Sequence, residues 1–276
     1  MKVSMLLLLT NVIGSRAKVI SDILKRCINT EYRIGMTGTL PTAAVDLLSI
    51  TSVLGSVLFT ITSKELIDRG ILTPLTVVGV ELKYPLDFIK QNRGRAFPEE
   101  VKLVETYENR NEVALKKMFS IIPVNHNVLL LCNHIEHVNS TAEWLRQHYP
   151  QRTVKIIDGG VKANVREDIR KKIEIEDGTV IVATFGTCST GINMPKLHEV
   201  ILYSSGKSKI KILQSLGRGL RKHSTKNRVF LFDCIDNLSY STKTNVIRNY
   251  LYQHWLERKK YYDEQKFPVQ TTVLEV

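Results

Sequence analysis

The sequence predicts an α/β fold in which a parallel β-sheet is flanked by helices. From about residue 75 to 235, short apolar runs rich in β-branched residues alternate with segments of helical periodicity. The chain has 276 residues, of which 43% are hydrophobic, so it can bury a sizeable core. Strands that alternate with helices pair in parallel through right-handed crossovers, and this gives the predicted sheet.

The individual elements follow from the same two periodicities. The expected strands are the apolar runs at 75–82, 128–131, 154–157, 180–183, 200–203 and 229–232. The expected helices have apolar residues three or four positions apart and fall at 99–119, 140–147, 164–173 and 209–221. Residues 84–98 are polar and basic, and we expect a loop there.

Two flanking segments complete the expected organisation into 1–72, 73–238 and 239–276. Residues 1–72 form a partial α/β piece, with a strand that ends near Thr39 and a later helix that enters at Ser63. Residues 239–276 form a basic, aromatic tail. Such a tail can stack on bases and contact phosphates, or it can pack its aromatic face on the domain.

The net charge, the cysteines and the length of the apolar runs indicate which kinds of partner and compartment to expect. The net charge of +12 points to a polyanion, most often nucleic acid, although a merely basic surface is the alternative. The four cysteines (27, 132, 188 and 234) lack CxxC spacing and are expected to be buried thiols in a reducing compartment. No run of 18 apolar residues exists, so we expect no membrane span.

A metal site is considered and set aside. Cys132, His134 and His137 lie close in sequence and are all metal-ligand types. No second cluster completes the set, and we therefore expect no metal bound by these residues.

Residues 179–222 carry the strongest indication of chemistry. Gln214, Arg218 and Arg221 share one face of the expected helix. Two guanidinium groups aimed at one spot favour an anion between them, and a phosphate accepts their planar forks well. We expect these arginines at the carboxyl edge of the sheet. A solvated basic helix face is the alternative.

A loop rich in hydroxyls and glycines follows the strand at 180–183. Backbone N–H groups and threonine hydroxyls in this loop, which runs on from Ala183 to Asn193, could hold a phosphate of a nucleotide or of a nucleic-acid strand. Taken alone, the segment favours an ordinary polar loop.

These segments together resemble the C-terminal half of superfamily-2 helicases. The run from Ala183 to Asn193 resembles motif V, and Gln214–Arg221 (QSLGRGLR) resembles motif VI. Met36–Thr39 resembles motif III, Leu129–Asn133 resembles motif IV, and Asp158-Gly159-Gly160 resembles the motif between IV and V. The match is closest to phage UvsW-type recombination and branch-migration helicases.

The resemblance implies a RecA-like fold and a role for each matched residue. Gln214, Arg218 and Arg221 would face the ATP γ-phosphate, with Arg221 as the arginine finger, and Gly191 and Asn193 would lie by the ribose. Thr184, Gly159 and Asn133 would contact nucleic acid. Thr37, Gly38 and Thr39 would couple the ATP state to the nucleic-acid track.

The same resemblance implies an incomplete motor. The sequence contains neither a GxxxxGK[ST] motif nor a DEAD or DEAH tetrad, which the family places before motif III. We therefore expect ATP and Mg²⁺ to be used only together with a separate N-terminal helicase half. The partner would be DNA, with RNA as an open alternative, in the cytoplasm of a phage-infected host. A non-catalytic basic DNA-binding module and a truncated remnant are the rival interpretations.

Overall fold

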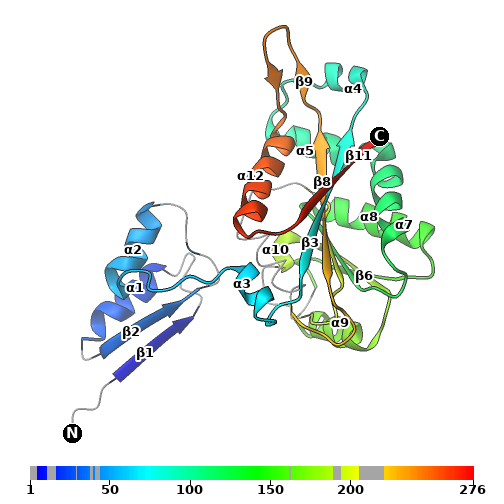
Figure 1. The fold of residues 1–276 in the computed structure, drawn as a ribbon. Helices are drawn as coiled ribbons and strands as arrows, with labels where there is room; N and C mark the ends of the chain where they lie inside the picture. Colours follow the sequence, from blue (N-terminus) through cyan, green and yellow to red (C-terminus); the bar gives the residue numbers. More distant parts are fainter. Residues whose placement is uncertain are drawn as a thin grey trace. The chain divides into compact units, whose positions relative to one another are not determined.

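The computed structural model describes residues 5–10, 17–28, 30–37, 40, 44–161, 163–188, 194–204 and 221–276. These residues divide into two compact units, Met1–Ile61 and Thr62–Val276 (Figure 1). The first division that we expected lay after residue 72. In the structure, helix α3 and its cap already belong to the second unit. In the part of the chain that the structure describes, no helix is long and apolar enough to cross a membrane.

The first unit is a small parallel pair of strands with two helices. It consists of β1 (Met5–Thr10), α1 (Ala17–Arg26), β2 (Thr30–Met36) and α2 (Ala44–Leu54). β1 pairs with β2 in parallel, and Leu24 of α1 is fully buried. Helix α2 is apolar on most of its surface yet buries none of its side chains. Two parallel strands are too few for a stable sheet on their own.

The second unit is built on a seven-stranded sheet in the order β11-β3-β8-β7-β4-β6-β5, and every neighbouring pair is parallel. The strands are β3 (Leu75–Lys83), β4 (Val128–Cys132), β5 (Thr153–Ile157), β6 (Thr179–Thr184), β7 (Glu199–Leu202), β8 (Val229–Asn237) and β11 (Val269–Glu275). The predicted parallel sheet is thus confirmed, and it contains every strand predicted between residues 75 and 235.

Both faces of the sheet are covered, which explains why its strands are apolar runs rather than alternating patterns. In β4, Val128 and Leu130 belong to one core cluster and Leu129 and Leu131 to the other. Helices α5 (Phe97–Glu105), α7 (Lys116–Ile121) and α8 (Ile135–His148) contribute to the first cluster. The second receives α9 (Ala163–Ile175), α10 (Phe185–Cys188) and most of the packed residues of α12 (Tyr250–Glu264).

Two local expectations need correction. The segment 84–98 is not only a loop, because α4 (Leu86–Gln91) forms within it. The single helix expected at 99–119 is divided into α5, α6 (Glu108–Arg110), a π-helical turn (Asn111–Leu115) and α7. Its break follows Thr106, whose hydroxyl bonds back to the Lys102 carbonyl at 2.8 Å. The first helix of this unit, α3 (Ser63–Asp68), begins at Ser63 as expected, and Thr62 and Glu65 form its capping box.

The segment 239–276 is an integral part of the second unit. Strand β11 is the edge strand beside β3, and α12 buries Trp255, Tyr261 and Tyr262 in the core. Arg258 is buried as well and forms a paired salt bridge with Asp233 of β8, with both N–O distances at 2.8 Å. The aromatic side chains buried along this helix pack on the domain, as the second of our two alternatives predicted.

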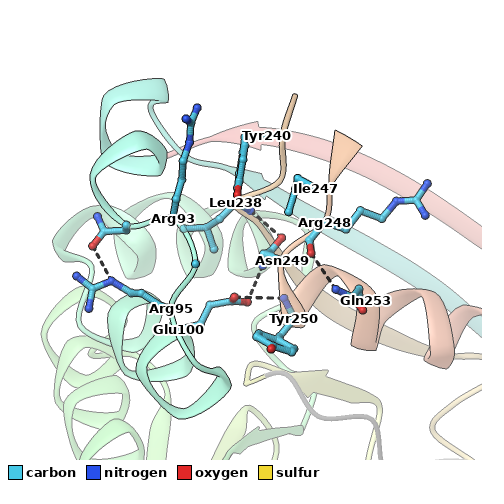
Figure 2. Close-up of a pocket in the computed structure, with 12 residues that line it drawn as sticks. Arg93, Arg95, Glu100, Leu238, Tyr240, Ile247, Arg248, Asn249, Tyr250 and Gln253 are labelled. Carbon is cyan, nitrogen blue, oxygen red and sulfur yellow. Dashed lines mark hydrogen bonds between the residues drawn. The ribbon is translucent and has the colours of Figure 1, made fainter. Parts of the chain in front are cut away.

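A short antiparallel hairpin, β9 (Tyr240–Ser241) and β10 (Val246–Ile247), connects β8 to α12. It faces the segment between α4 and α5 across a surface pocket (Figure 2). This pocket lies beyond the carboxyl ends of β3 and β8.

Candidate functional site

Three predicted site residues come together at the carboxyl edge of the sheet. Asn133 directly follows β4, Thr184 ends β6, and Gly159 lies just after β5. These are adjacent strands in the order β4-β6-β5, with Cys132 opposite Thr184 and Ile157 opposite Ala183. Neighbouring strands lie about 4.8 Å apart, so the three residues span roughly 10 Å of one edge. Ligands of open parallel sheets bind beyond this edge.

The two loops beside Thr184 are shaped by local hydrogen bonds. The Thr184 hydroxyl lies 2.7 Å from the Thr187 hydroxyl and accepts a bond from the Thr187 N–H at 3.4 Å. After β5, the Gly160 N–H donates to the Asp158 carboxylate at 2.8 Å. Among the described residues, no atom lies within 4 Å of a side chain added at Gly159 or Gly186, so this part of the chain leaves open space beside both backbones.

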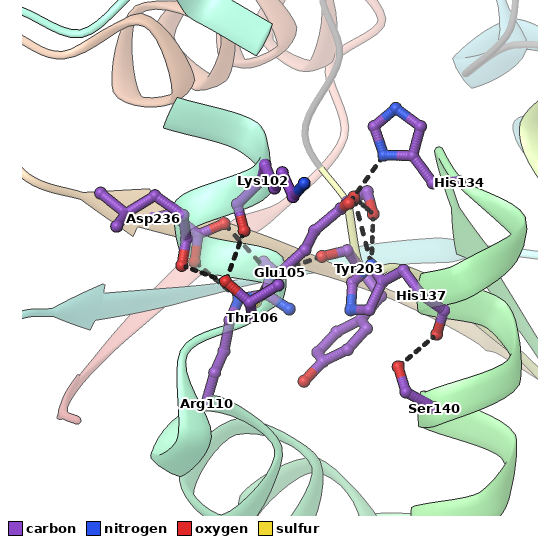
Figure 3. A network of polar contacts seen from close by, with 12 residues as sticks. Lys102, Glu105, Thr106, Arg110, His134, His137, Ser140, Tyr203 and Asp236 are labelled. Atoms are coloured by element: carbon purple, nitrogen blue, oxygen red, sulfur yellow. Dashed lines mark hydrogen bonds and ion pairs between the residues drawn. The ribbon is translucent and has the colours of Figure 1, made fainter. Parts of the chain in front are cut away.

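The segment that follows Asn133 is held in place by contacts to Glu105. His134 Nδ1 lies 2.7 Å from Glu105 Oε2, and His137 Nδ1 lies 3.2 Å from Glu105 Oε1. Ser204, just after β7, donates to the same Glu105 oxygen at 2.8 Å. Figure 3 shows how Glu105 connects the end of α5 to the start of α8. The loop after β4 is therefore fixed to α5 and to the end of β7.

The pKa values in this cluster favour an ionised carboxylate beside a neutral imidazole. Burial alone raises the pKa of Glu105, but hydrogen bonds from His137, His134 and Ser204 outweigh it and bring the pKa to about 2. Burial lowers the pKa of His137, and the hydrogen bond to Glu105 opposes this only in part. His134 and His137 thus serve as hydrogen-bond partners of Glu105. Among the described residues, no group of three or more His, Cys, Asp or Glu side chains is placed to hold a metal ion.

A second buried cluster lies behind the first. Arg110 forms a two-pronged salt bridge with Asp236 of β8, at 2.8 and 3.0 Å, and donates to the Tyr203 carbonyl at 2.6 Å. Its guanidinium group also lies 4.2 Å from the centre of the Tyr203 ring. Tyr84 donates to the same Asp236 carboxylate at 2.7 Å. This cluster ties α6 to the ends of β7, β8 and β3, and sequence reasoning did not find it.

Arg221 lies at the other edge of the sheet. Its backbone forms an isolated bridge with Leu72, and its carbonyl accepts a bond from Thr73 at 3.3 Å. Both partners precede β3, so the Arg221 backbone is at the amino edge. This differs from our expectation that the arginines lie at the carboxyl edge: Arg221 precedes β8, which begins at Val229, and therefore lies at the edge where that parallel strand starts.

The remaining predicted residues are divided between the first unit and the undescribed positions. Thr37 follows β2 in the first unit. Gly38, Thr39, Gly191, Asn193, Gln214 and Arg218 lie outside the described residues.

Comparisons with known proteins agree with this architecture. Residues 113–223 match the family described as helicase conserved C-terminal domain. The chain is 29% identical over 256 residues to the ATP-dependent DNA helicase UvsW of Enterobacteria phage T4, covering 91% of this chain and 51% of the relative. A putative helicase of a Sulfolobus islandicus filamentous virus is 24% identical and is covered over 42% of its length. The chain thus spans about half the length of these relatives or less.

Solved structures agree with the sequence relatives. The crystal structure of T4 UvsW superposes with a TM-score of 0.62 at 26% identity, covering 97% of this chain and 53% of that one. A fragment of a putative HsdR subunit of a type I restriction enzyme from Vibrio vulnificus shares the fold, with a TM-score of 0.65, 16% identity, and coverage of 99% and 58%. The resemblance to the C-terminal half of superfamily-2 helicases, and the RecA-like fold, are confirmed.

Proposed function

Because residues 113–223 match the helicase conserved C-terminal domain, we propose that residues 62–276 act as the second RecA-like domain of an ATP-dependent DNA helicase or translocase. Its role would be in recombination, repair or branch migration, the activities of the UvsW type. One observation carries the proposal: Asn133, Thr184 and Gly159 follow three adjacent parallel strands at one edge.

The three residues suit the backbone of a nucleic-acid strand. A threonine hydroxyl, an asparagine amide and an open glycine backbone can all reach phosphate or sugar without reading the base. They contribute no charge, so the attraction to the polyanion comes from the net charge of +12. In this proposal DNA is the substrate track.

The nucleotide side of the proposal rests on the motif residues. Gln214, Arg218 and Arg221 would contact the γ-phosphate of ATP, with Gly191 and Asn193 beside the ribose. Thr37, Gly38 and Thr39 would pass the state of the nucleotide to the DNA track. In phosphoryl-transfer enzymes that use an arginine finger, this residue raises the rate of the reaction by a factor of roughly 10³–10⁵. ATP would arrive with Mg²⁺, and the P-loop and the metal-binding acids would come from a separate N-terminal helicase segment.

The first unit offers a surface for such a segment. Its β1–β2 pair is only two strands wide. Large apolar side chains in it are exposed, including Val45 at 75%, Leu48 at 69% and Phe59 at 72%. Apolar side chains at this exposure are stabilised when further strands and helices cover them. We therefore propose that residues 1–61 complete their sheet with the segment that carries the P-loop.

A chimaera tests this proposal. The residues of T4 UvsW that precede its aligned region would be fused to this chain, and DNA-stimulated ATP hydrolysis would be measured. We expect hydrolysis by the chimaera and none by the 276-residue chain alone. Arg221→Ala in the chimaera should lower the rate by at least a hundredfold, whereas Arg146→Ala on the exposed face of α8 should leave it unchanged.

Two results would contradict parts of the proposal. Hydrolysis by the chain alone would show that it needs no separate P-loop. Full activity of the Arg221→Ala chimaera would remove Arg221 from the nucleotide site. DNA affinity of the chimaera that is indifferent to ATP would favour the rival function, a non-catalytic DNA-binding module.

A further inference from the structure

The pocket beside the β9–β10 hairpin has a volume of about 420 Å³ and a basic, aromatic rim. Figure 2 shows it between the α4–α5 connection and the segment that runs from the hairpin into α12. The residues used below are Arg93, Arg95, Glu100, Tyr240, Arg248 and Tyr250. None of them belongs to a helicase motif named above.

Three arginines from two separate segments surround this pocket. The Arg93 guanidinium group lies 4.3 Å from the centre of the Tyr240 ring, and Arg95 Nε donates to Asn92 at 2.9 Å. These neutral partners orient the two guanidinium groups and leave their charges in place. Among the described residues, no carboxylate forms an ion pair with Arg93, Arg95 or Arg248. The rim therefore carries three positive charges, and Figure 2 shows the guanidinium groups of Arg93, Arg95 and Arg248 pointing outward in different directions, so an anionic ligand would meet them along the surface around the pocket.

Hydrogen bonds partly offset the negative charge of Glu100 in the pocket. Glu100 therefore repels an anionic ligand less than a carboxylate without such partners would. Glu100 is buried, and its oxygens accept bonds from Asn249 Nδ2 at 2.7 Å, the Leu251 N–H at 2.8 Å and the Tyr250 N–H at 3.2 Å. The last two donors are at the start of α12, where the helix dipole offsets negative charge. Glu100 thus closes the floor of the pocket and fixes the hairpin to α5.

The pocket lies on the same edge of the sheet as Asn133, Gly159 and Thr184. Its segments follow the carboxyl ends of β3 and β8, and all seven strands are parallel. Along the sheet, β7 separates β8 from β4. Tyr250 is 47% exposed and offers a ring face on which a base can stack.

We propose that this pocket is a second nucleic-acid site, in which the arginines bind the phosphodiester backbone of a DNA strand and Tyr250 stacks on an unpaired base. The inference rests on the proposed DNA-binding function and extends its track along the carboxyl edge toward β8 and β3. Guanidinium groups beside an exposed tyrosine suit a strand that carries both phosphates and bases.

The test measures DNA binding by fluorescence anisotropy with a labelled single-stranded oligonucleotide over a range of NaCl concentrations. Each lost contact between an arginine and a phosphate should reduce the slope of log K against log [NaCl] by about 0.7. For the triple variant R93Q/R95Q/R248Q, we expect the slope to fall by about 2 and the affinity to fall at least tenfold at low salt. Tyr250→Ala should weaken binding about tenfold with the slope unchanged.

Control variants separate this inference from the proposed function. Lys117→Gln on the exposed face of α7 also removes a positive charge and should bind as the wild type does. Asn133→Ala and Thr184→Ala should weaken binding without changing the slope, because neither side chain is charged. The arginines are exposed, so the melting temperature of the triple variant should match that of the wild type.

The possible outcomes are distinguishable. If the triple variant keeps the wild-type slope while Asn133→Ala and Thr184→Ala weaken binding, the pocket is not a DNA site and the proposed function stands. If the wild-type chain fails to bind DNA, both proposals fail. A poly-glutamate peptide that displaces DNA as well as unlabelled DNA does would overturn the assignment to nucleic acid.

Discussion

Strand β4 has an asparagine at each end, and the two differ in almost every respect. Asn127 at the amino edge is buried, and its side chain donates to the carbonyls of Ile173, Glu176 and Lys196 and accepts from the Thr179 N–H. Asn133 at the carboxyl edge is only half-buried and adjoins the open backbones of the neighbouring loops. The same residue type is a buried part of the fold at one edge and is half-buried at the other.

The amino edge as a whole is closed by polar contacts within the protein. Glu199 is buried, lies 2.8 Å from His126 Nδ1 and accepts a bond from the Phe230 N–H at 3.1 Å. Lys226 donates to the Leu197 carbonyl at 2.7 Å. Polar side chains satisfied in this way stabilise a fold and are of little use to a substrate. The comparison of the two edges shows that polar residues at a strand end indicate a binding site only where solvent and ligands can reach them.

Exchanging each asparagine for alanine gives the largest expected difference between the two edges. Asn127→Ala leaves a buried N–H and several carbonyls without their partner, so the free energy of unfolding should fall by about 3 kcal/mol. Asn133→Ala should lower it by less than about 1 kcal/mol. Urea denaturation followed by circular dichroism measures both values. Equal losses for the two variants would show that the edges do not differ.

Lowering the pH is expected to reduce the stability of the fold by a smaller amount, through a histidine at the amino edge. Burial, followed by the nearby charges of His126 and Lys226, lowers the pKa of His198 to about 4 from its ordinary value near 6.5. Between these two values the unfolded chain binds a proton that the folded chain does not. The contribution of His198 to stability is therefore complete above pH 6.5 and is lost as the pH falls toward 4.

A variant isolates this contribution. His198→Gln keeps polar atoms near the Asn127 N–H and the Thr225 hydroxyl but cannot titrate. Its free energy of unfolding should lose roughly 1 to 3 kcal/mol less than that of the wild type between pH 6.5 and 4. If the two chains lose stability in parallel over this range, His198 is not the group that responds.

The sequence predicted those parts of the fold and site that depend on local pattern. The strands β4 to β8 are apolar runs, and Asn133, Gly159 and Thr184 follow them directly, so a parallel sheet necessarily brings these residues to one edge. The pocket formed by the segment before α5 could not be predicted, because a basic stretch such as Arg93-Gly94-Arg95 does not indicate which hairpin lies opposite it.

Contacts between distant residues could not be predicted. The Arg110–Asp236 and Arg258–Asp233 pairs join residues 126 and 25 positions apart, and nothing in the local sequence indicates the partner. The addition of β11 beside β3 has the same cause, since strand order in a sheet depends on which edge remains open. The amino-edge position of the Arg221 backbone likewise follows from the path of the chain and not from the motif.

Hydrogen exchange measured with and without single-stranded DNA tests the central claim, that the carboxyl edge of β4, β6 and β5 is the DNA-binding edge. We predict slower exchange on binding at the amides of 133–134, 158–160 and 184–187, with little change at 126–128 and 197–199. Gly159 and Gly186 are exposed in the structure and lie within the first three carboxyl-edge segments to be compared. DNA binding that leaves all three carboxyl-edge loops unprotected would contradict the account.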